Sequence, residues 1–111
     1  MSSKDRKWIR IRISGDMPPC RNSTVAAVYN DKIYIFGGYD TLTAELNDFH
    51  EFDTETAQWR TINSANPPPK MYGHTAVVYD NSLYIFGGEC SWKSIIMMFT
   101  SIIFELDNGK Y

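Results

Sequence analysis

Two groups of side chains in this sequence have the types and spacing that acid–base or metal chemistry requires. The first group is His50 with Glu51, flanked by Asp48 and Asp53. Imidazole and carboxylate groups this close together are able to share a proton or to bind a metal ion. The same mixture is also typical of the solvated edge of a strand. We adopt the second interpretation and predict neither a catalytic residue nor a metal site here.

The second group is a single histidine, His74, which directly follows Gly73. A histidine is suited to act as a general base or a metal ligand. No second ligand is evident for it, and the equivalent residue of an internal repeat, described below, is Thr24. We therefore predict a structural role for His74 and no cofactor for the chain.

The two cysteines, Cys20 and Cys90, are too few for a disulfide framework and form no CxxC pair. An activated thiol needs a histidine, clustered cations or a helix N-terminus beside it. Cys20 has only Arg21 next to it, which makes it the more reactive of the two without making it a nucleophile. We expect free thiols and predict that the chain is not an enzyme.

Charge and hydropathy narrow the range of partners. The formal net charge of −2 gives no general attraction to phosphate backbones or to anionic membranes. No apolar core follows the charged start of the chain, and no apolar run approaches the roughly 20 residues of a membrane span. These features predict an intracellular, cytoplasmic protein that binds neither nucleic acid nor membrane.

The elements that position these side chains are indicated by an internal repeat. At a shift of 50 residues, Gly37-Gly38 coincides with Gly87-Gly88, and each pair is preceded by Tyr-Ile-Phe. Pro18-Pro19 coincides with Pro68-Pro69 at the same shift. Each repeat therefore contains a proline pair followed by a glycine pair at a fixed distance.

One repeat contains four strand candidates separated by turn residues. They are residues 22–29, 32–36, 46–53 and 58–62. Asn30-Asp31 is a hairpin turn between the first two, and residues 39–45 are a loop between the second and the third. A unit of this size cannot bury both faces of its own sheet, so such units stack around an axis as propeller blades.

These motifs resemble the kelch repeat, in which a double glycine follows the second strand, a Phe-Asp stretch lies on the third and a tryptophan opens the fourth. Gly37-Gly38, Phe52-Asp53 and Trp59 match this pattern, and so do residues 72–78 and Gly87-Gly88 of the second unit. The 50-residue unit is similar to the leucine-zipper-like regulator and Rab-effector types of kelch protein. The resemblance implies an all-β fold, a partial kelch β-propeller of about two four-stranded antiparallel blades, with structural motif residues Gly37, Gly38, Trp59, Gly73, His74, Gly87 and Gly88.

The repeats divide the chain into three parts. Residues 1–13 are a tail and the outer strand of a preceding blade, residues 14–66 are the first repeat, and residues 67–111 are a second repeat that diverges and is truncated after Glu89. Residues 101–107 are predicted as its third strand, because residues 104–107 read like residues 50–53. Alternatively, everything after Glu89 is foreign sequence. Two blades leave strand edges bare, so association through exposed blade edges is expected.

The start of the chain reads as a strand. In residues 7–13 three isoleucines alternate with Arg10 and Arg12, as on a strand with one exposed face. Trp8 and Trp59 recur at matched positions of similar segments. We therefore predict that both tryptophans fill the same packing slot between adjacent blades and do not form a ligand-stacking pair.

Kelch proteins mostly bind other proteins, so the resemblance implies a protein-interaction module: a scaffold or adaptor, substrate-receptor, cytoskeletal or small-GTPase related. Variable loops at the open ends of a propeller form its binding surface. The candidate partner-binding residues in these loops are Arg21, Tyr39, Asp40, Met71 and Tyr72. The identity of the protein partner is not encoded in any motif. The alternatives are a fragment of a kelch-containing enzyme and a truncated product with no independent function.

Overall fold

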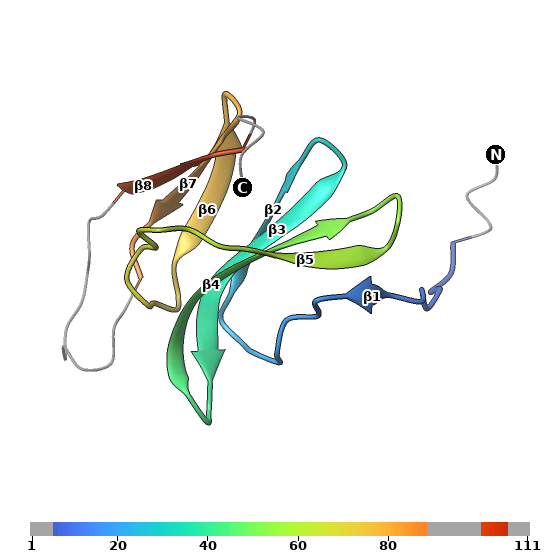
Figure 1. Ribbon diagram of the computed structural model, residues 1–111, viewed down its shortest axis with the longest axis horizontal. Coiled ribbons are helices and arrows are strands. Elements are labelled where there is room, and N and C mark those ends of the chain that lie inside the picture. The colour runs from blue at the N-terminus through green and yellow to red at the C-terminus, as the bar shows by residue number, and fades with distance from the viewer. Residues whose placement is uncertain (1–5, 89–100, 107–111) are drawn as a thin grey trace.

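The computed structural model describes residues 6–88 and 101–106, and of residues 101–104 it describes the backbone alone. Within these ranges the chain forms two β-sheets and no helix (Figure 1). The first sheet has the order β1-β5-β4-β3-β2, and the second has the order β6-β7-β8. This confirms the predicted fold class. The strands are β1 (Ser14–Gly15), β2 (Val25–Tyr29), β3 (Lys32–Asp40), β4 (Ala44–Asp53), β5 (Gln58–Ile62), β6 (Thr75–Tyr79), β7 (Ser82–Phe86) and β8 (Ser101–Glu105).

Each sheet contains a hairpin whose turn residues suit its geometry. Asn30 and Asp31 join β2 to β3 with φ of 56° and 66°, and Asp80 and Asn81 join β6 to β7 with φ of 52° and 64°. Two successive positive φ angles define a turn whose twist matches that of the flanking strands. Asn and Asp tolerate this conformation better than other residues with a side chain. The predicted turn at Asn30-Asp31 is therefore confirmed.

The hairpin of β3 and β4 is longer than the sequence predicts, and the expected loop at residues 39–45 is wrong. The strand register shifts at Gly37-Gly38, whose φ angles are 68° and 114°. Glycine adopts these angles readily, so the chain forms a bulge there and the ladder resumes with Gly38 opposite Leu46. Only residues 41–43 form the turn. The glycine pair bends the strand without ending it.

The core lies between the two sheets, which approach each other where β2 and β6 run side by side (Figure 1). Phe49 packs against both Tyr34 and Phe36 of the first sheet, with ring centroids 5.7 Å and 6.2 Å apart. Leu83 and Ile85 of β7 complete this cluster from the second sheet. Because the buried residues come from both sheets, each sheet stabilises the other by removing apolar surface from water.

The predicted strand at residues 7–13 is wrong, since residues 6–13 form no strand. The chain first joins the sheet at β1, which pairs in parallel with β5. A strand needs a hydrogen-bonded neighbour, and alternating isoleucines do not supply one. The apolar side chains of this segment therefore remain in solvent, with Ile9 68% and Ile11 56% exposed.

The two matched tryptophans do not share an environment. Trp59 on β5 packs against Phe52 on β4, with ring centroids 5.0 Å apart. Trp8 is 102% exposed, so the prediction that it fills the same packing slot is wrong. The slot beside Phe52 exists because β5 pairs with β4, whereas no strand of residues 6–88 and 101–106 pairs with the segment of Trp8.

The second sheet repeats the first three strands of the blade. β8 is its third strand, as predicted, with Phe104 opposite Leu83, just as Phe52 lies opposite Ile33 in the first sheet. Phe104 therefore corresponds to Phe52, and the sequence alignment with residue 50 is wrong by two positions. A shift of two residues keeps every side chain on its face, so the alternating pattern does not reveal it.

Predictions about residues 89–100 and 107–111, including Cys90 and the origin of the divergent segment, lie outside the described residues. Cys20 is described and is an exposed free thiol.

Candidate functional site

A cavity opens at the end of the sheets that carries the Gly37-Gly38 bulge and the connecting segments 16–24 and 63–74. We call this end the loop end. The cavity has a volume of about 360 Å³ and lies between the sheets, with apolar walls from Phe36, Phe49 and Ile85. Cavities of this size and mixed lining are typical of recognition sites. Its polar lining comes from Asn47, Asp48, Thr61, Asn63, Ser64 and Asn66.

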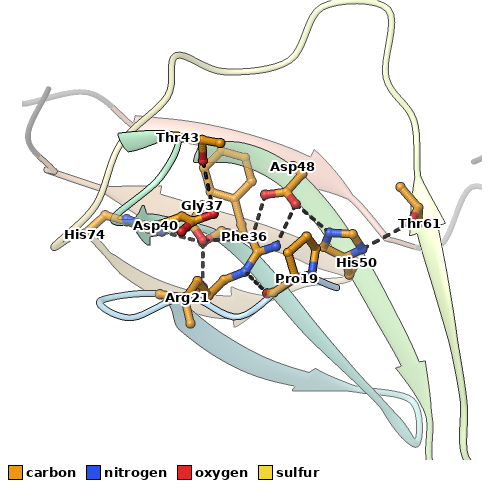
Figure 2. Close-up of polar contacts among 11 residues, drawn as sticks. Pro19, Arg21, Phe36, Gly37, Asp40, Thr43, Asp48, His50, Thr61 and His74 are labelled. Carbon is orange, nitrogen blue, oxygen red and sulfur yellow. Dashed lines mark hydrogen bonds and ion pairs between the residues drawn. The ribbon is translucent and has the colours of Figure 1, made fainter. Parts of the chain in front are cut away.

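An ion pair between a buried arginine and a half-buried aspartate fixes the segment before β2 to the sheet at this end (Figure 2). Arg21 donates from Nη1 to Oδ1 of Asp48 at 2.6 Å and from Nη2 to Oδ2 at 2.7 Å. It also donates to the carbonyl oxygens of Pro19 and Gly37, each at 3.2 Å. Such a two-pronged contact is the strongest geometry available to an arginine and a carboxylate.

Arg21 is therefore not a partner-binding residue, and that prediction is wrong. Its side chain is 4% exposed, and its hydrogen bonds are made within the chain. The guanidinium holds the loop end in place, because it joins segment 16–24 to β4 and to the glycine bulge.

The hydrogen bonds continue from Asp48 through the sheet. His50 Nε2 lies 2.7 Å from Oδ2 of Asp48, and His50 Nδ1 lies 3.2 Å from the hydroxyl of Thr61 (Figure 2). Carboxylate, imidazole and hydroxyl in this order could in principle activate the hydroxyl as a nucleophile. Here both carboxylate oxygens also accept from Arg21. The closed network favours a structural role, which is to hold β4 against β5 beside the cavity.

Asp48 carries a negative charge throughout the ordinary pH range. Burial alone would raise its pKa, but the hydrogen bonds and positive charge of Arg21, together with those of His50, outweigh it. They lower the pKa of Asp48 from 3.8 to about 2. The carboxylate therefore contributes a permanent charge to the cavity wall, although Arg21 offsets most of it.

The interpretation of this region as a solvated strand edge is wrong for its two central residues. His50 is 4% and Glu51 3% exposed. Glu51 accepts from the Tyr34 hydroxyl at 2.8 Å and from Arg60 at 3.0 Å. A buried charge requires such partners. Glu51 on β4 therefore binds Tyr34 on β3 and Arg60 on β5.

A second polar contact joins the two sheets at one carbonyl oxygen. His74 Nε2 lies 2.9 Å from the Phe36 oxygen, and the Thr24 hydroxyl donates to the same oxygen at 3.0 Å. The oxygen is an acceptor, so Nε2 carries the proton of the neutral ring. The residues that occupy the same position in the two repeats, Thr24 and His74, thus meet at one atom.

We expect the stability of the chain to fall as the pH drops below 6.5, in part because of His74. Burial lowers its pKa, and the hydrogen bond to Phe36 only partly opposes this. The unfolded chain therefore binds the proton first, and folding loses up to about 1.4 kcal/mol per pH unit below that point.

Denaturant unfolding of wild type and His74→Thr at pH 7 and pH 5 tests this. Threonine is the residue that the first repeat places at this position. The variant should be less stable at pH 7, because it leaves a cavity, but should lose less stability between the two pH values. Parallel pH curves for the two proteins would contradict the role of His74.

Two aromatic rings meet at the loop end. Tyr39 on β3 and Tyr72 on segment 63–74 pack edge to face, with ring centroids 5.3 Å apart, and both are half-buried. Asp40 accepts from the Leu42 backbone N–H at 3.1 Å and from the Thr43 hydroxyl at 3.3 Å, which closes the turn of the hairpin. These three predicted partner-binding residues thus lie on adjoining segments.

Met71 is a further correction. A partner-binding residue must reach the surface, but Met71, one of the candidates, is 0% exposed and belongs to the core. Its backbone forms a bridge with Leu46, and its carbonyl accepts from the Gly38 N–H at 2.9 Å. Segment 63–74 crosses the bulge at this point and turns the methionine inward.

The three remaining glycines of the predicted motif have backbone conformations that favour glycine. Gly73, Gly87 and Gly88 have φ of 73°, 75° and 109°. A β-carbon on Gly88 would lie 3.1 Å from the Met71 sulfur, whereas no described atom lies within 4 Å of one on Gly87. At Gly87 only the φ angle favours glycine, whereas at Gly88 close packing against Met71 favours it as well.

Sequence reasoning missed the residues that build the cavity. Thr61 was treated only as part of a strand, and Asp48 was considered only for catalysis. Asn47 donates to the Pro68 carbonyl at 2.9 Å and thus ties segment 63–74 to β4. The polar residues after β5, at 63, 64 and 66, were the one available signal, because they form a polar cluster between the end of a strand and a proline run.

Within residues 6–88 and 101–106, no group of three or more His, Cys, Asp and Glu side chains is arranged to hold a metal ion. In the same ranges there is no helix that could cross a membrane.

Comparisons with known proteins agree with this architecture. A family model described as the KLHDC2/KLHL20/DRC7 Kelch-repeats domain matches residues 1–109. Kelch domain-containing protein 3 of Bos taurus is 40% identical over 63 residues, which are 56% of this chain and 16% of that protein. Human leucine-zipper-like transcriptional regulator 1 is 39% identical over 67 residues, which are 57% of this chain and 8% of that protein. The chain thus spans less than a fifth of the length of either relative.

Proposed function

Because the chain belongs to the kelch-repeat family, whose repeats commonly mediate protein interactions, we propose that it binds another protein through its loop end. Within this proposal the chain acts as a scaffold or adaptor and not as an enzyme. The two repeats of the sequence analysis, residues 14–66 and 67–111, are part of the proposal.

The observation that carries the proposal is the Tyr39–Tyr72 ring pair at the end of the sheets where the cavity opens. Tyrosine supplies a large contact area at a small loss of conformational freedom, and its hydroxyl forms hydrogen bonds at the edge of an interface. The cavity, which neither tyrosine lines, has a volume of about 360 Å³ and could accept a side chain of the partner. Its amides and hydroxyls offer both donors and acceptors.

Rigidity of the loop end supports the same proposal. Arg21 and Asp48 hold segment 16–24, Asn47 holds segment 63–74, and Asp40 closes the hairpin turn. A surface that is ordered before binding loses less conformational entropy when the partner arrives. Binding loops supported by a rigid sheet are the usual arrangement for recognition.

The test is affinity capture with wild type, the double variant Tyr39→Ala/Tyr72→Ala and the control Val28→Ala. Val28 is 67% exposed on β2, next to the Asn30-Asp31 turn at the opposite end of the sheet. Each aromatic anchor at an interface should account for about 2 kcal/mol, or roughly 30-fold in affinity, so the double variant should bind roughly 1,000-fold more weakly.

Proteins captured by wild type and by Val28→Ala, but lost with the double variant, would support binding at the loop end. Thermal unfolding of each variant controls for folding, since the double variant loses about 1 kcal/mol of ring–ring attraction and, in addition, the burial of two half-buried side chains. Equal capture by all three proteins would place the binding surface elsewhere.

A further inference from the structure

The hairpin of β3 and β4 ends in a turn that exposes an apolar side chain. Leu42 lies in this turn and is 90% exposed. In Figure 1 the hairpin extends past the neighbouring strands at the loop end. Turns favour glycine, asparagine, aspartate and serine, because these residues supply backbone freedom or local hydrogen bonds. A leucine side chain supplies neither, so the turn itself does not explain why this residue is present.

A second turn of the chain has the same sequence motif with a different residue in this position. Residues 40–44 read Asp-Thr-Leu-Thr-Ala, and residues 53–57, between β4 and β5, read Asp-Thr-Glu-Thr-Ala. The second turn lies at the opposite end of the sheet, where the Thr54 hydroxyl donates to the carbonyl oxygen of Asp31 at 2.7 Å. One local motif thus carries a leucine at the loop end and a glutamate away from it.

The hydrogen bonds of the motif do not depend on the side chain in this position. The Leu42 N–H donates to Oδ1 of Asp40 at 3.1 Å. The Glu55 N–H donates to Oδ1 of Asp53 at 2.8 Å, although this loop is one residue longer. Glu55 is exposed, as Leu42 is. An aspartate that accepts from the backbone two residues on stabilises a turn through main-chain atoms, so folding does not require leucine here.

The turn holds Leu42 in a fixed position before any partner binds. Asp40 accepts from the Thr43 hydroxyl at 3.3 Å, and its carbonyl oxygen accepts from the Thr43 backbone N–H at 3.2 Å. Together with the Leu42 N–H, three donors of the turn therefore bind one residue. An apolar side chain on an ordered turn loses less conformational entropy on binding than one on a flexible loop.

The charge of the loop end indicates which kind of protein surface would cover Leu42. The hairpin beyond the glycine bulge and segments 16–24 and 63–74 have a formal charge of −2. Their carboxylates are Asp16, Asp40, Glu45 and Asp48, and their cations are Arg21 and Lys70. A surface with an excess of carboxylates attracts a partner with positive charge and repels one with negative charge.

We propose that Leu42 is an anchor residue, which enters an apolar pocket of the partner protein, and that lysine and arginine side chains surround this pocket. The inference rests on the proposed function, since it describes the partner that binds at the loop end. Burying the leucine stabilises the complex by removing apolar surface from water. A second copy of this chain fits less well, because its own cavity is lined by Asp48 at the same acidic end.

Photo-cross-linking identifies what Leu42 contacts. A diazirine analogue of leucine is placed at position 42 of the full chain, and mass spectrometry locates the residue to which it becomes attached. The matched control carries the same analogue at position 55, which has the equivalent place in the second turn. We expect position 42, and not position 55, to attach to apolar residues of another protein, with lysine or arginine beside them.

Binding of the purified cross-linked protein then measures the contribution of the side chain. Leu42→Glu introduces the residue that the second turn already carries, so it should unfold like wild type but bind about 30-fold more weakly. Leu42→Met keeps the apolar volume and should bind within a few-fold of wild type. Glu55→Leu adds an exposed leucine at the opposite end and should leave the affinity unchanged.

Attachment of position 42 to a second copy, to another residue of the same chain or to an acidic surface would overturn the proposal. It also fails if a protein binds through Tyr39 and Tyr72 but is neither cross-linked from position 42 nor weakened by Leu42→Glu. Binding at the loop end would stand in that case. If Tyr39→Ala/Tyr72→Ala captures the same proteins as wild type, or wild type captures none, the proposed function itself fails and this inference with it.

Discussion

Replacing Asp48 with alanine is expected to lower the free energy of unfolding by about 3 kcal/mol. Removing one member of a buried ion pair leaves the other charge without compensation, at a cost of roughly 3 to 5 kcal/mol. Arg21 is 4% exposed, so its charge would stay buried, while Asp48 is 32% exposed and partly hydrated, which favours the lower value. The variant also removes the acceptor of His50. Urea unfolding monitored by tryptophan fluorescence measures the effect.

Two control variants distinguish the effect of breaking the Arg21–Asp48 pair from the effect of removing any charged side chain. Lys32→Ala removes one partner of a more exposed pair, Lys32 and Asp53 at 3.8 Å, and should cost less than about 1 kcal/mol. The double variant Arg21→Met/Asp48→Ala removes both buried charges and should recover much of the loss. If Asp48→Ala lowered the free energy of unfolding as little as Lys32→Ala, the Arg21–Asp48 pair would not hold the loop end.

The same carboxylate predicts a dependence of stability on acid. The pKa of Asp48 is lowered from 3.8 to about 2 in the folded chain, so the unfolded chain binds the proton first as pH falls. The stabilisation is fully present above pH 3.8 and is lost as pH falls through about 2. After allowance for its partial exposure it amounts to about 1 to 2 kcal/mol. Asp48→Asn should flatten the acid limb of the stability curve.

The second large effect is expected for Gly37→Ala, which should destabilise the chain by about 3 kcal/mol. Gly37 has φ of 68°, a conformation that costs a residue with a side chain about 1 to 2 kcal/mol. A β-carbon there would also lie 2.9 Å from the Met71 carbonyl oxygen and 2.9 Å from His74 Cε1. Backbone has to move to relieve the first contact, so the bulge and segment 63–74 would separate.

Gly87→Ala is the matched control, because it is the same residue of the other repeat. Its φ is 75°, yet no described atom lies within 4 Å of the added β-carbon. It should therefore show only the cost of conformation, about 1 to 2 kcal/mol. Thermal or urea unfolding of both variants gives the difference directly. Equal losses would mean that the close approach of segment 63–74 to Gly37 does not contribute to stability.

Much of the fold follows from local pattern. The turn at Asn30-Asp31 depends on residues near one another in sequence and is as predicted. The strands before and after it are present too, although they cover residues 25–29 and 32–40 where 22–29 and 32–36 were predicted. Local pattern failed at Gly37-Gly38, because glycine marks both the end of a strand and a bulge within one. It failed again at residues 7–13, because alternation shows that a segment is able to form a strand but not that it has a neighbour.

The candidate site was less predictable, because its contacts join distant segments. Arg21 and Asp48 are 27 residues apart, and His74 and Phe36 are 38 apart. The residue types alone made Arg21 and Met71 suitable for an interface. Only the path of segments 16–24 and 63–74 across β4 decided that both are buried.

The sequence by itself determined the repeat, the family resemblance and the hairpins, because spacing and turn chemistry are local properties. The tertiary structure decided which side chains reach solvent. In the folded chain Arg21, Met71 and Glu51 are buried and Trp8 is exposed. Tyr39 packs against Tyr72 at the loop end. Burial depends on which segment covers a residue, and these covering segments are distant in sequence, so the local pattern does not predict it.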